Sequence, residues 1–374
     1  MKRVAFIVDA WFPVYGGGQV YVWEIARRLV KRGWAVDIHT RALIDEGGKG
    51  WAQSEMHADG HLRVFRYRPT SQFGQPLVRL WFLFRVLVAL LVRRADVLNP
   101  QSILPGLPSW LAGKLIRRPV VMTVHGTALF LPTSGLSLRQ RFERRLERFV
   151  LTGLRYSREI SVASNFVKLP NVNQPVVIIP NGVDVSRFDR LQVPKSDHPA
   201  VLFVGRFDWI KGIDVLLEAW PNVRSVIPAA ELHLVGYGYE QDKLRDLAGR
   251  LKIEDSVHFL GKRLGDDLVR LFKSSHLFVL PSRSEGQPLT LLEAWAAKLP
   301  VVATDVGDNR ALVERSEGGQ VVSPENREEL SAAIVQALQH PTEANQAYQL
   351  VKREYSWDVA TERILQQYQA VSPS

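Results

Sequence analysis

The sequence predicts an α/β protein built from two doubly wound domains in tandem. Short β-rich runs alternate with longer helical patterns along nearly the whole chain, which is typical of parallel sheets with crossover helices. The length of 374 residues suits two to three domains at roughly 150 residues each. A polar stretch with two prolines, residues 191–199, interrupts the alternation, and we interpret it as the linker after a first domain over residues 1–190.

Six strand candidates precede this linker and six follow it. Those of the first half are residues 4–9, 35–40, 97–99, 120–125, 160–163 and 176–179, with a helix predicted over 20–32. Those of the second half are residues 201–205, 232–236, 257–260, 277–281, 301–304 and 320–322. Ligands of such sheets bind beyond the carboxyl ends of the strands, so we expect functional residues there and a central cleft between two facing domains.

Composition and charge exclude several classes of protein. The absence of cysteine excludes a disulfide scaffold, thiolate metal sites and thiol nucleophiles. The first 190 residues hold 28 Lys and Arg against 13 Asp and Glu, and the remainder holds 20 against 25. Only the first domain is therefore expected to meet an anionic surface. The longest apolar run, 79–93, is interrupted by Arg85 and is too short to span a bilayer. We interpret it as a buried or surface-lying helix and, with no export signal, expect a cytoplasmic protein.

Two features of the first domain could contact a ligand. The first strand runs into a turn, residues 13–18, in which Gly17 and Gly18 open a helical pattern and could bring backbone amides close to an anion. Tyr21 stands where a dinucleotide fingerprint has its third glycine, which argues against a dehydrogenase. His125 ends the fourth strand and could hydrogen bond to a sugar hydroxyl or a leaving group. The alternatives are a flexible turn and a structural histidine.

Two cations open the second domain. Arg206 follows the first strand of that domain, and Lys211 lies just before a helix that is predicted to begin near Gly212. A guanidinium, an ammonium and a helix N-terminus together could bind a diphosphate. The alternative is a pair of solvated loop charges.

The segment 284–294 carries two carboxylates. Pro288 suits the first turn of a helix that would point Glu293 inward, whereas Glu285 stays on the preceding loop. The free amides of Leu289 and Thr290 could receive a phosphate oxygen. Each carboxylate could accept two hydrogen bonds from a sugar diol, and one carboxylate for each of two sugars would fit a nucleotide sugar.

These motifs resemble a known family. The spacing of Glu285 and Glu293, together with GRFDWIKG, HLFVLPS, EGQPLTLLEAW, LPVVATDVGDN, PNGVD and the final YSWDVATERILQQY, is similar to the retaining glycosyltransferases of family 4. The resemblance covers essentially the whole chain. It implies the GT-B fold: two Rossmann-like domains, with a nucleotide-sugar-binding domain over 200–352 and a C-terminal helix, 353–374, that crosses back onto the acceptor-side first domain. Lys298 and Asp308 stand where this family usually has glycine.

The resemblance also implies a role for each candidate. Glu293 would hold the ribose diol and Glu285 the transferred sugar. Arg206 and Lys211 would hold the diphosphate. His125 would face the sugar near the reacting bond. Amides at Gly17, Gly18, Leu289 and Thr290 would assist donor binding.

Catalysis is expected to need neither a metal nor a cofactor beyond the nucleotide-sugar donor. Cleavage of a sugar–phosphate bond puts negative charge on the diphosphate, and no D-x-D triplet is available to hold a metal there. Arg206, Lys211 and a helix N-terminus are expected to stabilise that charge. Retention of configuration with no evident nucleophile fits a same-face displacement, as the family implies.

The expected acceptor is a glycan or a lipid-linked sugar of bacterial cell-surface polysaccharide or glycolipid synthesis. Residues 138–158 place apolar side chains at helical spacing among arginines and could lie on an anionic membrane, at the inner face of the cytoplasmic membrane. The alternative is a core helix with a solvated basic face. Two alternative functions are a sugar-nucleotide epimerase or phosphorylase of similar fold, and a non-catalytic basic module that binds nucleic acid or an acidic polymer. The second leaves Glu285 and Glu293 unexplained, so no nucleic-acid partner is expected.

Overall fold

The chain forms two compact units. A computed structural model describes residues 1–12, 16–43, 54–71, 76–101, 103–127, 129, 137–169, 171–172 and 175–372. Unit 1 comprises Met1–Pro180 and Trp357–Ser374, and unit 2 comprises Asn181–Ser356. The predicted linker, residues 191–199, lies inside unit 2, where Lys195 Nζ donates a hydrogen bond to the carbonyl of Ser275.

Unit 1 contains a five-stranded sheet, β3-β4-β2-β1-β5, and a three-stranded sheet, β6-β7-β8. A parallel bridge between Leu98 and Val120 joins the two. The strands are β1 (Arg3–Val8), β2 (Ala35–Leu43), β3 (Ser54–His57), β4 (Leu62–Ser71), β5 (Val97–Pro100), β6 (Val121–Val124), β7 (Arg158–Ser161) and β8 (Val176–Ile178). The central strands are buried on both faces, which is why they are continuous apolar runs in the sequence.

The β3–β4 pair was not predicted. The two strands run antiparallel at the edge of the five-stranded sheet, and β4 pairs in parallel with β2. Arginines interrupt the apolar pattern of β4, so the sequence does not indicate a strand there. In the structure Arg63 makes two hydrogen bonds of 2.8 Å to Asp37 on β2, and Arg3 makes a third of 2.9 Å. The Asp37 side chain is only 1% exposed, so this ion-pair cluster neutralises a charge inside the sheet.

The helices of unit 1 cover both sheets. They are α1 (Gly17–Lys31), α2 (Pro76–Val92), α3 (Ile103–Ile116), α4 (Leu138–Arg148) and α13 (Trp357–Val371). Ser137 begins α4 with a capping box, in which its hydroxyl accepts from the Gln140 amide. The helix predicted over 138–158 is shorter than expected: α4 ends at Arg148 and a π-helical turn follows at Phe149–Gly153, since the chain must then enter β7.

Unit 2 contains one parallel six-stranded sheet in the order β11-β10-β9-β12-β13-β14. The strands are β9 (Ala200–Val204), β10 (Glu231–Val235), β11 (Val257–Gly261), β12 (Leu277–Leu280), β13 (Val301–Thr304) and β14 (Gly319–Val322). The helices are α5 (Val185–Arg190), α6 (Ile213–Val226), α7 (Gln241–Leu251), α8 (Gly265–Ser274), α9 (Leu289–Ala296), α10 (Asn309–Ser316), α11 (Arg327–Gln339) and α12 (Asn345–Glu354). All twelve predicted strands are present in the structure. Each of the two units is a doubly wound α/β unit, as predicted.

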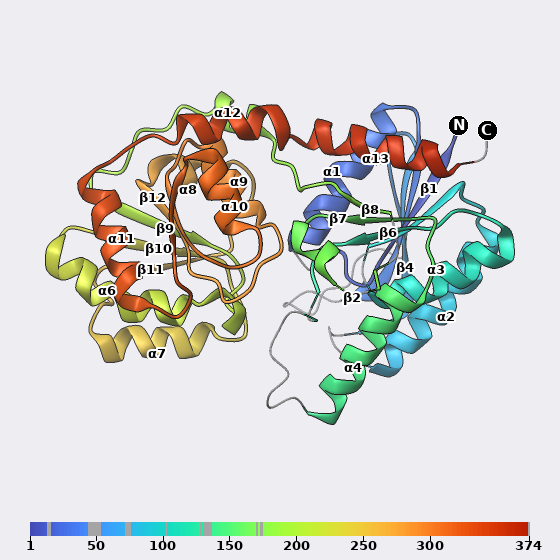
Figure 1. Ribbon diagram of the computed structural model, residues 1–374, viewed down its shortest axis with the longest axis horizontal. Helices are drawn as coiled ribbons and strands as arrows, with labels where there is room; N and C mark the ends of the chain where they lie inside the picture. Colours follow the sequence, from blue (N-terminus) through green and yellow to red (C-terminus); the bar gives the residue numbers. More distant parts are fainter. Residues whose placement is uncertain are drawn as a thin grey trace. The chain divides into compact units, whose positions relative to one another are not determined.

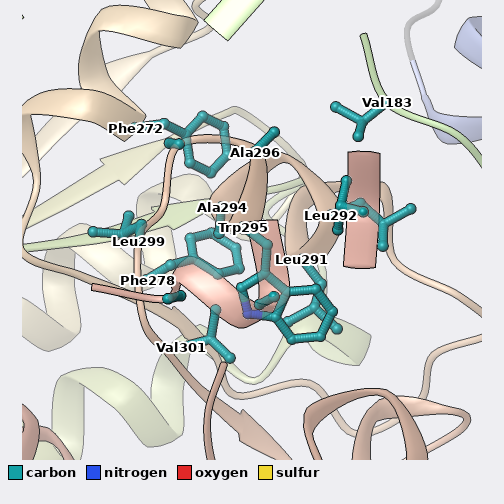
Figure 2. Close-up of a cluster of buried hydrophobic side chains, with 14 of the residues drawn as sticks. Val183, Phe272, Phe278, Leu291, Leu292, Ala294, Trp295, Ala296, Leu299 and Val301 are labelled. Atoms are coloured by element: carbon teal, nitrogen blue, oxygen red, sulfur yellow. The ribbon is translucent and has the colours of Figure 1, made fainter. Parts of the chain in front are cut away.

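Two apolar cores lie on the two faces of this sheet. One core packs α6, α7 and α11 against the sheet through side chains such as Trp220. The other packs α8, α9 and α12 against the opposite face and contains Phe272, Phe278 and Trp295. Figure 2 shows Leu291, Leu292 and Trp295 of α9 inside this second core. The position of α9 is therefore determined by apolar burial.

Helix α13 belongs to unit 1, where it packs against α1 (Figure 1). Asp358 lies near Arg28 and Arg32 of α1, and the ring of Trp357 contacts Tyr21 edge to face. The buried Tyr368 donates a hydrogen bond of 2.6 Å to Asn99 Oδ1 at the end of β5. Among the described residues, no helix is both long enough and apolar enough to cross a bilayer.

Tyr368→Phe is expected to lower the free energy of unfolding by about 1 kcal/mol, because it removes one buried hydrogen bond. The loss stays near this value since Gln101 Nε2 still donates to Asn99 Oδ1 at 2.7 Å. Urea unfolding would measure it, with Tyr239→Phe at a 75% exposed position as the control. Equal unfolding curves for Tyr368→Phe and the unmodified protein would contradict a role for this bond in holding α13.

Candidate functional site

The loop after β9 carries the two predicted cations. The buried Phe207 anchors it, and the Phe207 amide donates to the Tyr237 carbonyl at 2.9 Å. A 3₁₀ turn, Trp209–Lys211, then leads to Gly212, which has a φ of +61°. A Cβ at Gly212 would lie 2.1 Å from the Pro281 carbonyl oxygen. Only glycine allows this approach, which brings the loop after β9 against the loop after β12.

The structure places Lys211 beside Glu285. Lys211 Nζ lies 2.6 Å from Glu285 Oε1, and Ser282 Oγ donates to the same oxygen at 2.7 Å. The side chains of Lys211 and Glu285 are 21% and 8% exposed. Lys211 is therefore a partly buried, ion-paired group and not a solvated loop charge. This pair joins two side chains that the sequence analysis assigned to different parts of a ligand.

Arg206 is not part of this pair. Its guanidinium lies 2.9 Å from the carboxylate of Asp208 and is 62% exposed, whereas the Asp208 side chain is 5% exposed. Each predicted cation thus has a carboxylate partner. The exposed guanidinium remains accessible to a further anion, because an arginine fork offers five donors.

Sequence reasoning missed a third cation, Arg283. It follows β12 and makes a bidentate pair with Asp214, with both distances 2.8 Å, and it also contacts Glu325 and the ring of Trp209. Burial opposes the charged form, but the hydrogen bonds that Arg283 donates to Asp214 and Glu325 raise the pKa of Arg283 above its ordinary value. Its position just past a predicted strand and two residues before Glu285 was the sequence signal that could have identified Arg283 as a site residue. Arg283 holds the loop after β12 against the start of α6.

The N-terminus of α9 contains the predicted amide donors. Leu289 and Thr290 lie in the first turn, where N–H groups have no acceptor within the helix. Pro288 precedes this turn as the N-cap instead of occupying it. Gln287 is fixed by Asn181, whose side-chain amide donates to the Gln287 carbonyl at 2.7 Å. Because α9 is packed in the core shown in Figure 2, the backbone amides of Leu289 and Thr290 are held in a fixed position.

Glu293 projects from the same helix. The residue is half-buried, and its carboxyl group is desolvated enough that burial raises the pKa of Glu293 to about 7, although Arg187 acts in the opposite direction. A carboxyl that titrates near neutrality can donate as well as accept a hydrogen bond. The structure gives no contact between Glu293 and Glu285 among the described residues.

The loop after β13 completes this edge of the sheet. Gly307 has a φ of +58°, and a Cβ there would lie 2.3 Å from the Glu285 carbonyl oxygen. The Asp308 amide donates to the Gly286 carbonyl at 3.3 Å. Asp308 itself has a φ of −93°, so its backbone does not require the glycine that is usual in similar sequences. Lys298, in contrast, has a φ of +58°, a left-handed conformation that glycine adopts more readily.

Unit 1 brings Gly18 and His125 together. A Cβ on Gly18 would lie 3.8 Å from His125 Cδ2, and Tyr21 contacts the His125 ring edge to face at 4.7 Å. His125 Nε2 lies 2.9 Å from Gln101 Oε1. Burial lowers the pKa of His125 to about 4, so the ring is neutral at pH 7. Gly17 lies in the first turn of α1, and the predicted turn residues Pro13, Val14 and Tyr15 lie outside the described residues.

One group of potential metal ligands occurs in the described part of the chain. Glu231, His233 and His258 offer ligand atoms that lie within 4.8 Å of one another. These residues are on β10 and β11, and Glu231 begins β10. The group is therefore not on the loops that carry Arg206, Lys211 and Glu285.

Glu293→Gln is expected to change how stability depends on pH. Below about pH 4 both folded and unfolded chains carry a protonated Glu293. As the pH rises, the unfolded chain loses this proton first, because the folded pKa is about 7, so the stability of the unmodified protein falls up to that pH. The advantage of Glu293→Gln should therefore grow from pH 5 to pH 8 in urea unfolding. The exposed Glu328→Gln serves as control, and a pH-independent difference for Glu293→Gln would contradict the desolvated carboxyl.

Comparison with known proteins covers nearly the whole chain. Residues 15–187 match the family model described as Glycosyltransferase Family 4, and residues 198–340 match the one described as Glycosyl transferases group 1. The chain is 28% identical to the phosphatidyl-myo-inositol mannosyltransferase of Mycobacterium tuberculosis, over 100% of this chain and 98% of that one. It is 27% identical to an uncharacterised glycosyltransferase of Methanocaldococcus jannaschii, over 95% of each chain.

Solved structures show that the fold is the same as that of known proteins. The sucrose-phosphate synthase of Thermosynechococcus elongatus superposes with a TM-score of 0.83 at 22% identity, over 99% of both chains. The Anabaena protein HepE, in complex with UDP-glucose, superposes with a TM-score of 0.75 at 20% identity, over 99% of this chain and 100% of that one. The family assigned from the sequence motifs is confirmed: the chain belongs to glycosyltransferase family 4 and is a glycosyltransferase of the GT-B fold.

Proposed function

We propose that this glycosyltransferase moves a hexose-type sugar from a nucleotide diphosphate sugar to a glycan or lipid-linked acceptor, with retention of configuration. The observation that carries the proposal is the Lys211–Glu285 pair, at 2.6 Å, beside Ser282 and ahead of the first turn of α9. A carboxylate that binds sugar hydroxyls and a cation that binds phosphate are thus held together. The HepE complex with UDP-glucose supports a nucleotide-sugar donor.

Arg206 and Lys211 are assigned to the diphosphate. As the bond between the anomeric carbon and the phosphate oxygen breaks, its electron pair moves to that oxygen, and negative charge grows on the leaving group. Fixed positive groups at this position lower the barrier. The amides of Leu289 and Thr290, at the positive end of α9, add to this effect. These groups supply the stabilisation that a metal gives in other enzymes, so we propose a metal-independent reaction with no cofactor besides the donor.

Glu285 is assigned to the transferred sugar and Glu293 to the ribose diol. Each carboxyl group can bind two neighbouring hydroxyls. The acceptor hydroxyl attacks the anomeric carbon on the face from which the phosphate departs, and its proton goes to the departing phosphate oxygen. This step keeps the configuration and requires no enzyme nucleophile. Because Nε2 of the neutral His125 ring carries the proton that faces the Gln101 oxygen, Nδ1 can accept from a sugar hydroxyl. Gly17 and Gly18 contribute backbone amides to donor binding.

The acceptor is proposed to be a glycan or a lipid-linked sugar in bacterial cell-surface polysaccharide or glycolipid synthesis, reached from the inner face of the cytoplasmic membrane. The amphipathic helix α4 supports this proposal. Leu138 and Phe142 are 85% and 67% exposed, with Arg141, Arg145 and Arg148 on the same helix. Basic amphipathic helices bind anionic lipid surfaces.

A panel of nucleoside diphosphates and their sugars tests the donor assignment. One member is expected to raise the melting temperature and to be hydrolysed slowly without an acceptor, and EDTA should leave that hydrolysis unchanged. Calorimetry with the free nucleotide should show weaker binding to Glu293→Ala than to the exposed control Glu328→Ala. If no nucleotide sugar in the panel is bound or hydrolysed, the proposed donor class is wrong.

Arg206→Ala and Lys211→Ala are each expected to lower kcat about 10²- to 10³-fold, by analogy with the loss of one oxyanion donor. Lys243→Ala is the matched control and should keep full activity, because Lys243 is a 76% exposed cation of α7 in unit 2. The melting temperature of each variant shows whether it is folded. Full turnover in a folded Lys211→Ala variant would remove the diphosphate role.

A further inference from the structure

Helix α2 is apolar on both of its faces. Phe82, Val86 and Leu90 are buried in the core of unit 1. The opposite face is exposed and is also apolar, with Leu77 79% and Phe84 55% exposed. The exposed large apolar side chains of α2 are Leu77, Leu80, Trp81, Phe84, Val88 and Val92. A helix that is hydrophobic all round normally has its outer face covered, so this exposed face indicates a partner.

Helix α3 extends the same surface. It packs against α2 and shares its core through Ala112, and Figure 1 shows the two helices side by side. Leu107, Leu111 and Leu115 repeat every four residues along α3 and are 39%, 38% and 61% exposed. We call the exposed apolar side chains of α2 and α3 together the apolar face.

A basic cavity adjoins α3. Its volume is about 390 Å³, and the residues that line it include Trp110 and four cations, Lys114, Arg117, Arg118 and Arg155. None of the described lining residues is acidic. Arg118 has Asp96 at 3.5 Å. The indole N–H of Trp110 is buried and has no acceptor among the described residues. The basic cavity therefore offers several charged donors to an anion.

The charge of the surrounding chain has the same sign. Residues 76–168, from α2 to the end of the segment after β7, hold 15 Lys and Arg against four Asp and Glu. The sequence of α2 contains Arg79 and Arg85 and no acidic residue. Cations and apolar side chains on one surface are the two signals that together give stable binding to anionic lipid.

We infer that the apolar face lies against an anionic lipid bilayer and that the basic cavity binds the phosphate of a lipid headgroup. Leucine and phenylalanine would enter the acyl boundary. The indole of Trp81, which donates to the Arg68 carbonyl at 3.1 Å, suits the polar–apolar boundary where tryptophan collects. A bilayer fits better than a protein partner. Arginines border the apolar face, and α2 has no acidic side chain that could pair with a basic groove on another protein.

This inference rests on the proposed function only in its choice of a lipid-linked acceptor. It also assigns a surface different from α4, so the two can be tested apart. If it holds, the enzyme meets its acceptor at the bilayer through the apolar face and the basic cavity of unit 1, and neither includes a residue assigned to the donor.

Vesicle sedimentation with the full chain tests the inference. Vesicles of phosphatidylcholine alone are compared with vesicles containing 30 mol% phosphatidylglycerol, a proportion of about one third chosen to give an anionic surface. The apolar variant carries Leu80→Ser, Trp81→Ser and Phe84→Ser, and the cavity variant carries Lys114→Ala, Arg117→Ala and Arg155→Ala. Matched controls in unit 2 are Val226→Ser with Tyr239→Ser and Leu264→Ser, and Lys243→Ala with Arg250→Ala and Arg327→Ala.

The unmodified chain is expected to bind the anionic vesicles and not the neutral ones. The apolar variant should bind at least about tenfold more weakly. The cavity variant should bind about a hundredfold more weakly, at about fivefold for each cation removed. The unit 2 controls should bind like the unmodified chain. Hydrolysis of the donor in solution should be unchanged in every variant, which separates this inference from the proposed function.

Two further measurements keep the test decisive. Brominated lipid should quench tryptophan fluorescence in the unmodified chain and quench it less in Trp81→Phe, a variant that keeps the apolar ring. Inorganic phosphate tests the other source of the anion: phosphate should raise the melting temperature of the unmodified chain and not that of the cavity variant. Stabilisation by phosphate without vesicle binding would assign the cavity to a free anion and overturn the inference.

Other outcomes would also overturn it. Vesicle binding that is lost only on replacing Leu138, Phe142 and Phe149 with serine would assign the membrane contact to α4 instead. Equal binding to neutral and anionic vesicles would remove the role of the cavity. Self-association of the unmodified chain, abolished in the apolar variant and without any vesicle binding, would show that a second copy covers the apolar face.

Discussion

Close backbone contact between loops is the constraint on which the candidate donor site of unit 2 depends. The loops after β9, β12 and β13 approach one another more closely than a side chain would allow. Gly212 abuts the Pro281 carbonyl, and Gly307 abuts the Glu285 carbonyl, both in the left-handed conformation. This contact puts Lys211, Ser282 and Glu285 within hydrogen-bond distance. The apolar core beneath α9 then holds the first-turn amides at a set position beside the same loop.

The cations on and near these loops of unit 2 are each balanced by a carboxylate. Lys211, Arg206 and Arg283 are each paired with a carboxylate, through Glu285, Asp208 and Asp214 with Glu325. A site of free cations would repel itself and lower stability. Pairing removes this cost. Under the proposed function, binding of the diphosphate would be an exchange of partners for at least Lys211. The pair of Arg283 has a different use, since a bidentate contact with Asp214 holds two loops together.

Unit 1 distributes its charge in another way. Asp37 inside the five-stranded sheet is neutralised by Arg3 and Arg63, whereas the cations of the basic cavity, Arg118 apart, face a space without acidic groups among the described residues. The first arrangement stabilises the fold. The second is suited to an external anion, and it adjoins helices whose outer faces are apolar. The excess positive charge of the first half of the sequence thus has two physical uses.

Local patterns in the amino-acid order were sufficient for the doubly wound architecture, because strands buried on both faces are apolar runs and their helices have a different period. The candidate site residues were also identified from local patterns. Arg206 and Lys211 follow a predicted strand, and Glu285 and Glu293 have a characteristic spacing. Strand β4 was not predictable, since Arg63 becomes acceptable in a sheet only beside Asp37. The Lys211–Glu285 and Arg283–Asp214 contacts join residues 74 and 69 positions apart. Only the tertiary fold determines such pairs, because it sets which strand ends are neighbours.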